Sequence, residues 1–259
     1  MSPTHLERQQ PLPRSWAEGP VGSEVEEIVG GLQNPWSISP ETARVLTRVT
    51  LGQECDSILE FGAGMSSMVL AAALKQRGGG RLTSVEEQPD WCVDAWRTVE
   101  TTDGVDAAMI PATVRLKFDR RGLYYGWREA TAIARRGPYD IVFVDAPWGG
   151  YGRDGSLYAA IESVQDGGII VLDDAARERE QRTVRRWLLN YPNLRLLAND
   201  CGVERGLAVL QKTPRALRDP SVIQRLLEVW GTSISDGVSN IWSIIKYLRR
   251  RRGTIPPAC

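Results

Sequence analysis

The stretch SILEFGAGMSS, residues 57–67, decides the fold. Its first five residues are mostly apolar, which is typical of a short buried strand. Gly62 and Gly64 then allow a sharp turn into a helix that we expect to run to about Gln76. Glycines at this place also let a ligand approach the backbone beside a helix N-terminus. The stretch therefore predicts a strand, a ligand-binding turn and a helix.

The same alternation of strand and helix continues to residue 212, which predicts an α/β fold with a doubly wound, mostly parallel sheet. The last two expected strands have only a short connection, so we expect an antiparallel hairpin there. Strands are expected over 57–61, 82–86, 113–118, 140–144, 168–172, 194–197 and 206–210, and the later helices over 91–98, 157–164 and 178–189.

Three further segments flank this domain, which we place at residues 55–212. Residues 1–20 are expected to be a flexible leader. Residues 21–54 are expected to be helical, with Ser39 as the N-cap and Pro40 as the first residue of a helix. Residues 213–259 are expected to form helices over 221–230 and 238–248, followed by four arginines. The second helix has an apolar face, which suits the catalytic domain, a second copy in a homodimer, or an anionic membrane surface.

The composition excludes several classes of enzyme. Among the 259 residues there is one histidine, His5, and the four cysteines form no CxxC pair. Histidine-dependent triads and multi-histidine zinc sites are therefore excluded, as is a Walker A loop, because no Gly-Lys pair is present. Basic and acidic residues both number 32, so no net positive charge attracts nucleic acid. The N-terminus carries no apolar signal segment, so we expect a cytoplasmic protein.

Two acidic residues accompany the glycine turn. Glu60 precedes it directly, and Glu86 ends the second expected strand, 24 residues after Gly62. A carboxylate at that strand end can accept hydrogen bonds from both hydroxyls of a ribose. Ser67 stands where a dinucleotide-binding turn needs its third glycine, and Glu60 would repel a pyrophosphate. An NAD-dependent oxidoreductase is therefore the weaker alternative, whereas a ligand with an ammonium and a sulfonium suits Glu60.

The pattern Glu-x-Gly-x-Gly with an acid at the next strand end resembles the class I S-adenosylmethionine-dependent methyltransferases. The resemblance implies a Rossmann-like methyltransferase fold and the activity of that family. It also implies that S-adenosylmethionine is the cofactor and that Trp91 flanks its adenine or packs a helix. A serine at 66 departs from the glycine often found there. The residues implied to hold the cofactor are Glu60, Gly62, Ala63, Gly64, Ser66, Ser67, Glu86 and Asp145.

A second acidic group follows the later strands: Asp145 after residues 140–144, and Asp173 with Asp174 after residues 168–172. Three converging carboxylates suit Mg²⁺, and the layout resembles the metal-dependent branch that includes catechol O-methyltransferases. By that resemblance Asp145, Asp173 and Asp174 would be both catalytic and metal-binding. Asp174 replaces the asparagine of that branch, and no lysine stands shortly after Asp145, where the branch usually has its base. The alternative is that Asp173 or Asp174 caps the following helix.

The tetrapeptide Asp145-Ala146-Pro147-Trp148 permits another interpretation. It resembles the motif of nucleobase amino-methyltransferases, in which the acid and a backbone carbonyl hold an amine and the aromatic ring stacks. Ala146 breaks that motif, and no basic groove accompanies it. Arg153, in the following glycine-rich loop, is either a receiver of a substrate anion or a solvated surface residue. The aromatic residues Tyr124, Tyr125 and Trp127 either wall the acceptor pocket or pack a connection.

The sequence thus predicts O-methylation of a small hydroxylated molecule, such as a sugar, polyketide, phenol or peptide natural product, with or without Mg²⁺. Asp145 would activate the hydroxyl, because carboxylates and metal are the available means when histidine is lacking. N-methylation through residues 145–148, and a non-catalytic methyltransferase-like scaffold, remain the alternatives.

Overall fold

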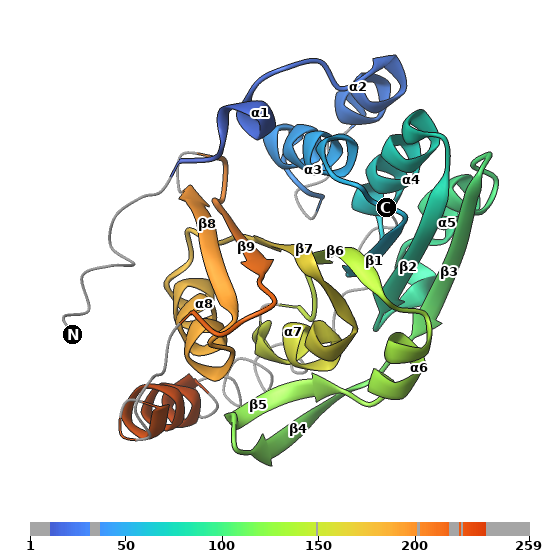
Figure 1. Cartoon of the computed structure of the whole chain (residues 1–259). Coiled ribbons are helices and arrows are strands. Elements are labelled where there is room, and N and C mark those ends of the chain that lie inside the picture. The colour runs from blue at the N-terminus through green and yellow to red at the C-terminus, as the bar shows by residue number, and fades with distance from the viewer. Residues whose placement is uncertain are drawn as a thin grey trace.

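A seven-stranded sheet forms the centre of the molecule (Figure 1). The computed structural model describes residues 11–31, 37–148, 150–200, 203–217, 223 and 225–236. The strand order is β3-β2-β1-β6-β7-β9-β8, and β9 is antiparallel to both neighbours while the other pairs are parallel. These strands are β1 (Ser57–Phe61), β2 (Gly80–Glu86), β3 (Val105–Pro111), β6 (Tyr139–Val144), β7 (Val164–Asp173), β8 (Leu194–Asp200) and β9 (Leu207–Lys212).

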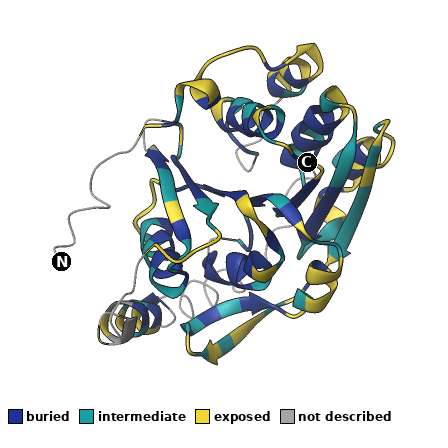
Figure 2. Ribbon diagram, in the orientation of Figure 1, coloured by how far each residue is buried: buried dark blue, intermediate teal, exposed yellow. Residues whose placement is uncertain are grey.

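Helices cover both faces of the sheet and make two apolar layers (Figures 1 and 2). One core includes residues of α2 to α5, and the other includes residues of α6, α7 and α8. All five residues of β1 are buried, because both faces of this central strand are covered. The helices are α1 (Arg14–Ala17), α2 (Ser23–Gly30), α3 (Pro40–Gly52), α4 (Met65–Arg77), α5 (Val93–Glu100), α6 (Ala130–Arg135), α7 (Asp154–Ala160) and α8 (Glu178–Asn190), with short 3-10 turns η2 (Pro89–Trp91) and η3 (Ile161–Ser163).

The strand order places a ligand site between β1 and β6. From β1 the chain builds outward through β2 to β3 and then returns to β6 on the other side of β1. Ligands in such sheets bind outside the carboxyl ends of the strands at this reversal.

The strand order and directions confirm the predicted doubly wound, mostly parallel sheet and its final antiparallel hairpin.

The third strand of the sheet differs from our expectation. We expected residues 113–118 in the sheet, but β3 (Val105–Pro111) pairs with β2 instead. Residues 114–119 form β4 (Val114–Asp119), which pairs with β5 (Gly122–Trp127) in a separate antiparallel hairpin. Residues 105–127 contain three strands, β3, β4 and β5. Pairing with β2, which local strand propensity does not specify, determines which of the three joins the large sheet.

Two described helices before α3, α1 and α2, pack on the domain. Leu12 and Trp16, which we expected in a flexible leader, are each only 7% exposed and join one apolar core. Arg48 of α3 donates to the carbonyl oxygens of Trp16 and Ala17, at 3.2 and 2.8 Å. The predicted cap of α3 is confirmed, since the Ser39 hydroxyl accepts a hydrogen bond from the Thr42 amide at 3.1 Å.

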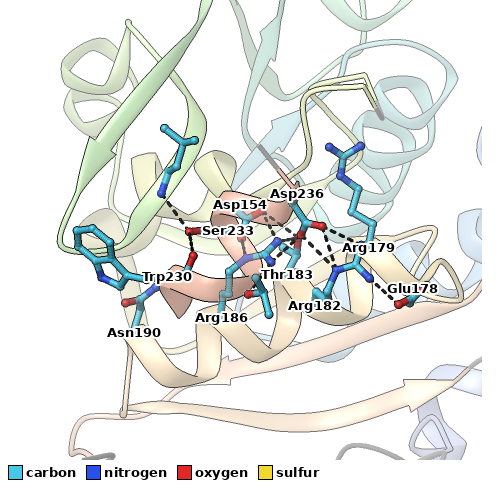
Figure 3. A network of polar contacts seen from close by, with 12 residues as sticks. Asp154, Glu178, Arg179, Arg182, Thr183, Arg186, Asn190, Trp230, Ser233 and Asp236 are labelled. Carbon is cyan, nitrogen blue, oxygen red and sulfur yellow. Dashed lines mark hydrogen bonds and ion pairs between the residues drawn. The ribbon is translucent and has the colours of Figure 1, made fainter. Parts of the chain in front are cut away.

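A helical segment of the C-terminal region packs on α8 and on the β4–β5 hairpin (Figure 3). This segment comprises the π-helical turn η4 (Arg225–Trp230) and the helical residues 231–236. Asp236 accepts hydrogen bonds from Arg186 of α8, at 2.8 Å, and from Arg182, at 3.1 Å. The predicted helix over 238–248, the four arginines after it, and His5 lie outside the described residues. Within the described part of the chain, none of the helices has the length and apolar character needed to cross a membrane.

Candidate active site

A pocket opens at the carboxyl ends of β1, β2 and β6. It contains the glycine turn, the end of β2 and the start of the loop after β6. Asp145, which is partly exposed, lies on the pocket wall. The lining residues are Ser37, Ile38, Gly62, Ala63, Gly64, Met65, Ser66, Glu86, Glu87, Gln88, Trp91, Asp145, Ala146 and Trp148.

The turn requires glycine at position 62. Gly62 has a φ of 98°, in the region that L side chains rarely adopt, and its amide donates to the carbonyl of Val85 at 2.9 Å. A Cβ at this position would lie 3.1 Å from the Cβ of Ala146, so the first residues of the two loops pack closely. Gly64 is the N-cap of α4, which leaves the backbone of the turn accessible to a ligand.

Glu60 lies beneath the turn and not on the pocket wall. Its side chain is fully buried, and its Oε2 accepts hydrogen bonds from the hydroxyls of Ser67, at 2.5 Å, and Ser84, at 2.6 Å. The Ser67 hydroxyl in turn accepts from the Gly64 amide at 3.0 Å. Burial raises the pKa of Glu60 to about 7. Glu60 therefore supports the turn from below through Ser67, whose hydroxyl binds both Glu60 and the Gly64 amide.

Glu86 faces the pocket, as expected for a ribose-binding acid. Its Oε2 accepts from the Ala63 amide at 2.9 Å, and its Oε1 accepts from the Gln88 amide at 2.6 Å. Burial raises the pKa of Glu86, and these backbone amides oppose the rise. A carboxylate oxygen has more than one acceptor position, so Glu86 can bind two hydroxyls while these bonds persist.

The three predicted aspartates come together at the ends of β6 and β7. Asp145, Asp173 and Asp174 each offer an oxygen, and these oxygens lie within 4.8 Å of one another. Asp173 and Asp174 are buried, and the Asp174 backbone has a φ of 57°. Burial raises the pKa of Asp145, and the Arg153 guanidinium opposes this rise.

The positively charged side chain of Arg153 lies among these carboxylates. The Arg153 Nη2 is 2.6 Å from Asp145 Oδ1 and 2.7 Å from Asp174 Oδ2. Its Nη1 donates to the backbone oxygen of Asp173 at 2.6 Å. The Arg153 side chain is only 4% exposed, so the expected position on the surface is wrong. Its guanidinium binds carboxylates of the protein, and Arg153 is not among the residues that line the pocket.

The arrangement does not fit a resident divalent ion. Asp174 Oδ1 has no hydrogen-bond partner among the described residues, which alone would favour a metal. However, a cation bridging Asp145 and Asp174 would compete with the Arg153 guanidinium for the oxygens that it already binds. Mg²⁺ also requires oxygen ligands at about 2.0–2.1 Å in near-octahedral geometry, with no positive group between them. The metal role of the three aspartates stays a prediction, and the ion pairs of Arg153 with Asp145 and Asp174 count against it.

The alternative role of the aspartates, helix capping, is wrong. Helix α8 begins at Glu178, its N-cap is Arg177, and no side-chain cap bond is present there. The Arg177 side chain instead pairs with Asp174 Oδ2 at 2.8 Å.

Two aromatic residues of β5, Tyr124 and Trp127, are buried in the protein. Trp127 is fully buried and stacks on Phe61 with ring centroids 5.7 Å apart. Tyr124 contacts the ring of Tyr158 edge-on at 4.8 Å. These residues pack a connection, as one of our two interpretations expected, whereas Trp91 and Trp148 line the pocket.

The sequence did not reveal that Glu180 belongs to the site, nor that Arg153 pairs with its carboxylates. Glu180 is 1% exposed, and its Oε1 lies 4.0 Å from Arg153 Nε. Helical spacing offers a signal for Glu180, because Thr183, Val184 and Trp187 share its inward face. Arg153 offers no such signal, since it lies in a loop.

Comparisons with known proteins agree with this geometry. Residues 59–175 match a family model described as a methyltransferase domain, Methyltransf_24. None of the curated proteins matches the chain significantly in sequence.

Several solved structures share the fold at low identity. A methyltransferase from Podospora anserina, bound to S-adenosylhomocysteine, is 14% identical with a TM-score of 0.52, over 74% of this chain and 89% of that one. An O-methyltransferase from Bacillus cereus, also in complex with S-adenosylhomocysteine, is 18% identical with a TM-score of 0.50, over 74% and 92%. A methyltransferase from Geobacter sulfurreducens is 16% identical with a TM-score of 0.51, over 78% and 91%.

The sheet order and the pocket beside the glycine turn define a class I methyltransferase fold. Residues 59–175, which include the glycine turn and the ends of β2, β6 and β7, are the part of the chain that matches the methyltransferase domain model.

Proposed function

We propose that this protein binds S-adenosylmethionine in the pocket beside the glycine turn and methylates a hydroxyl oxygen of a small molecule. One observation carries the proposal: Asp145 lines the same pocket as the turn and Glu86. A carboxylate at that place can accept the proton of a hydroxyl group at the moment of transfer.

The residues of the chain divide the work. Glu86 would hold the ribose hydroxyls, and the backbone of residues 62–64 would hold the methionine part of the cofactor, since all of these residues line the pocket. Trp91 and Trp148 supply apolar faces on the pocket wall. The bound cofactor supplies an electrophilic methyl group on a sulfonium. Positioning of the two reactants and exclusion of water supply much of the rate.

The chemical step is a direct displacement. Bound S-adenosylmethionine would supply its methyl group to the acceptor oxygen, and S-adenosylhomocysteine would leave with the electron pair of the broken carbon–sulfur bond. The hydroxyl proton moves to the Asp145 carboxylate. The raised pKa of Asp145, caused by burial, makes it a better proton acceptor than an ordinary aspartate.

N-methylation through residues 145–148 is the second candidate, supported by Trp148 on the pocket wall. The carbonyl oxygen of Ala146 accepts a hydrogen bond from the Ser156 hydroxyl at 2.6 Å. This bond directs the carbonyl toward α7, whereas an amine would need it in the pocket. We therefore favour oxygen as the acceptor.

The test uses the full chain with S-adenosylmethionine and a panel of sugars, phenols, polyketides and hydroxylated peptides. Mass spectrometry of the products locates any added methyl group. We expect an O-methyl product, and we expect Asp145→Asn to lower kcat roughly 10²–10⁴-fold while S-adenosylhomocysteine still binds. An N-methyl product would favour the second candidate. Cofactor binding without turnover on any acceptor would favour the scaffold alternative.

A further inference from the structure

The Arg153 guanidinium occupies the centre of the acidic cluster. One nitrogen, Nη2, bridges Asp145 and Asp174, and Nη1 binds the backbone of Asp173. Glu180 adds a fourth carboxylate on the Nε side, at 4.0 Å. Burial alone would lower the pKa of Arg153, but the surrounding carboxylates, Asp145 first, raise it. The arginine is therefore charged and is the cation that these acids surround.

Figure 3 shows a second buried network around Asp154, the residue that directly follows Arg153 in the chain. The Asp154 carboxylate accepts from Arg186 at 2.6 and 2.8 Å and from Thr183 at 3.1 Å. The Asp154 carbonyl accepts from the Trp187 indole at 3.1 Å. Because three residues of α8 fix Asp154, the Arg153 backbone has little freedom to carry the guanidinium away from the cluster.

We propose that Arg153 takes the place of a divalent cation at this site and is the positioning residue for Asp145. Its guanidinium neutralises Asp145 and Asp174 and holds the Asp145 carboxylate at the pocket wall, where the acceptor hydroxyl would lie. The site therefore excludes divalent metal. The role assigned to Asp145 rests on the proposed function, whereas the exclusion of metal is testable without it.

Metal titration tests the exclusion directly. Wild type is titrated with Mg²⁺ by calorimetry and with Tb³⁺ by luminescence, for which Trp148 on the pocket wall is a nearby donor. We expect no stoichiometric binding at the cluster. Arg153→Gln removes the internal cation and leaves the carboxylates, so we expect this variant to gain one Tb³⁺ site at least tenfold tighter than any in wild type. Adding Asp174→Asn to that variant should abolish the gain.

Two further variants separate the role of Arg153 from general charge. Arg177→Gln also removes a positive charge from Asp174, but from a side chain that is 52% exposed, and it should gain no site. Arg153→Lys keeps a charge in the cluster and should still exclude metal. A stoichiometric metal site in wild type that Asp174→Asn removes would overturn the proposal, and so would a site gained equally by Arg177→Gln. The wild-type titration decides the matter even where Arg153 variants fold poorly.

Activity supplies a separate readout. We expect methyl transfer by wild type to be unchanged by EDTA and unchanged by added Mg²⁺. We expect Arg153→Gln to lower kcat at least tenfold, with Arg153→Lys recovering part of it. Activity lost in EDTA and restored by Mg²⁺ would overturn the proposal. The absence of transfer to every acceptor would count against the proposed function alone, since the metal titrations would stand.

Discussion

The carboxylate of Glu86 accepts a hydrogen bond from the Ala63 amide at 2.9 Å, so the end of β2 is tied to the glycine turn. Replacement by alanine removes both this tie and the acceptor for the ribose hydroxyls. We expect Glu86→Ala to weaken S-adenosylhomocysteine binding at least tenfold, or about 1.4 kcal/mol, in isothermal titration. Glu24→Gln, an exposed carboxylate paired with Lys75, is the control and should bind as wild type does. Unchanged affinity in Glu86→Ala would place the ribose elsewhere.

Ser67 and Ser84 both donate to Glu60, but only Ser67 also binds the turn. Each serine-to-alanine change leaves a buried carboxylate with one donor fewer, so we expect each to lower the free energy of unfolding by roughly 1–3 kcal/mol. Ser67→Ala also frees the Gly64 amide, so it alone should weaken cofactor binding. Denaturant unfolding and calorimetry measure the two effects. Equal cofactor affinity in the two variants would show that Ser67 does not support the turn.

Glu60 makes the stability of the free protein depend on pH. Burial raises its pKa from an ordinary value of 4.5 to about 7, so between these values the native state holds a proton that the unfolded state releases. The contribution of Glu60 to stability is therefore present below about pH 4.5 and is lost as the pH rises to about 7. Glu60→Gln removes this dependence.

We expect the Tm of Glu60→Gln, relative to wild type, to be higher at pH 8 than at pH 5. The difference corresponds to at most about 3 kcal/mol, since one pKa unit is about 1.36 kcal/mol. Differential scanning calorimetry without cofactor measures it, with Glu24→Gln as the exposed control. If the difference in Tm between Glu60→Gln and wild type is the same at both pH values, the pKa of Glu60 is not raised in the native state.

Asp154 and Arg186 form a buried ion pair, with side chains 11% and 3% exposed. Asp154→Ala leaves Arg186 with Asp236 as its remaining carboxylate partner among the described residues. Breaking a buried pair costs about 3–5 kcal/mol, and we expect a loss near the lower end. Asp94→Ala breaks the exposed pair with Arg97, where about 0–1 kcal/mol is expected. Equal losses in denaturant unfolding would contradict the difference in burial.

The sequence predicts those parts of the site that are continuous in the chain. The turn at 62–64 and the strand before it are set by neighbouring residues, and Glu86 follows from the length of one strand–helix unit. The hydrogen bonding of Glu60 was not predicted, because one of its donors, Ser84, comes from the adjacent strand. Arg153 was not predicted either, because its carboxylate partners come from the ends of β6 and β7 and from α8. The third strand was misplaced since local propensity does not specify pairing.

The contact between the β4–β5 hairpin and the C-terminal helical segment has a consequence for local opening. The Ser233 hydroxyl accepts a hydrogen bond from the Leu123 amide at 3.2 Å. A Cβ on Gly122 would lie only 2.4 Å from this hydroxyl oxygen, so the two segments approach closely. The ring of Phe118 also meets that of Trp230 edge-on at 4.9 Å. The hairpin and the C-terminal helical segment both lie outside the seven-stranded sheet. Because they contact each other, each limits the fraying of the other. Their amides should exchange with deuterium together, as one cooperative unit that opens before the sheet does.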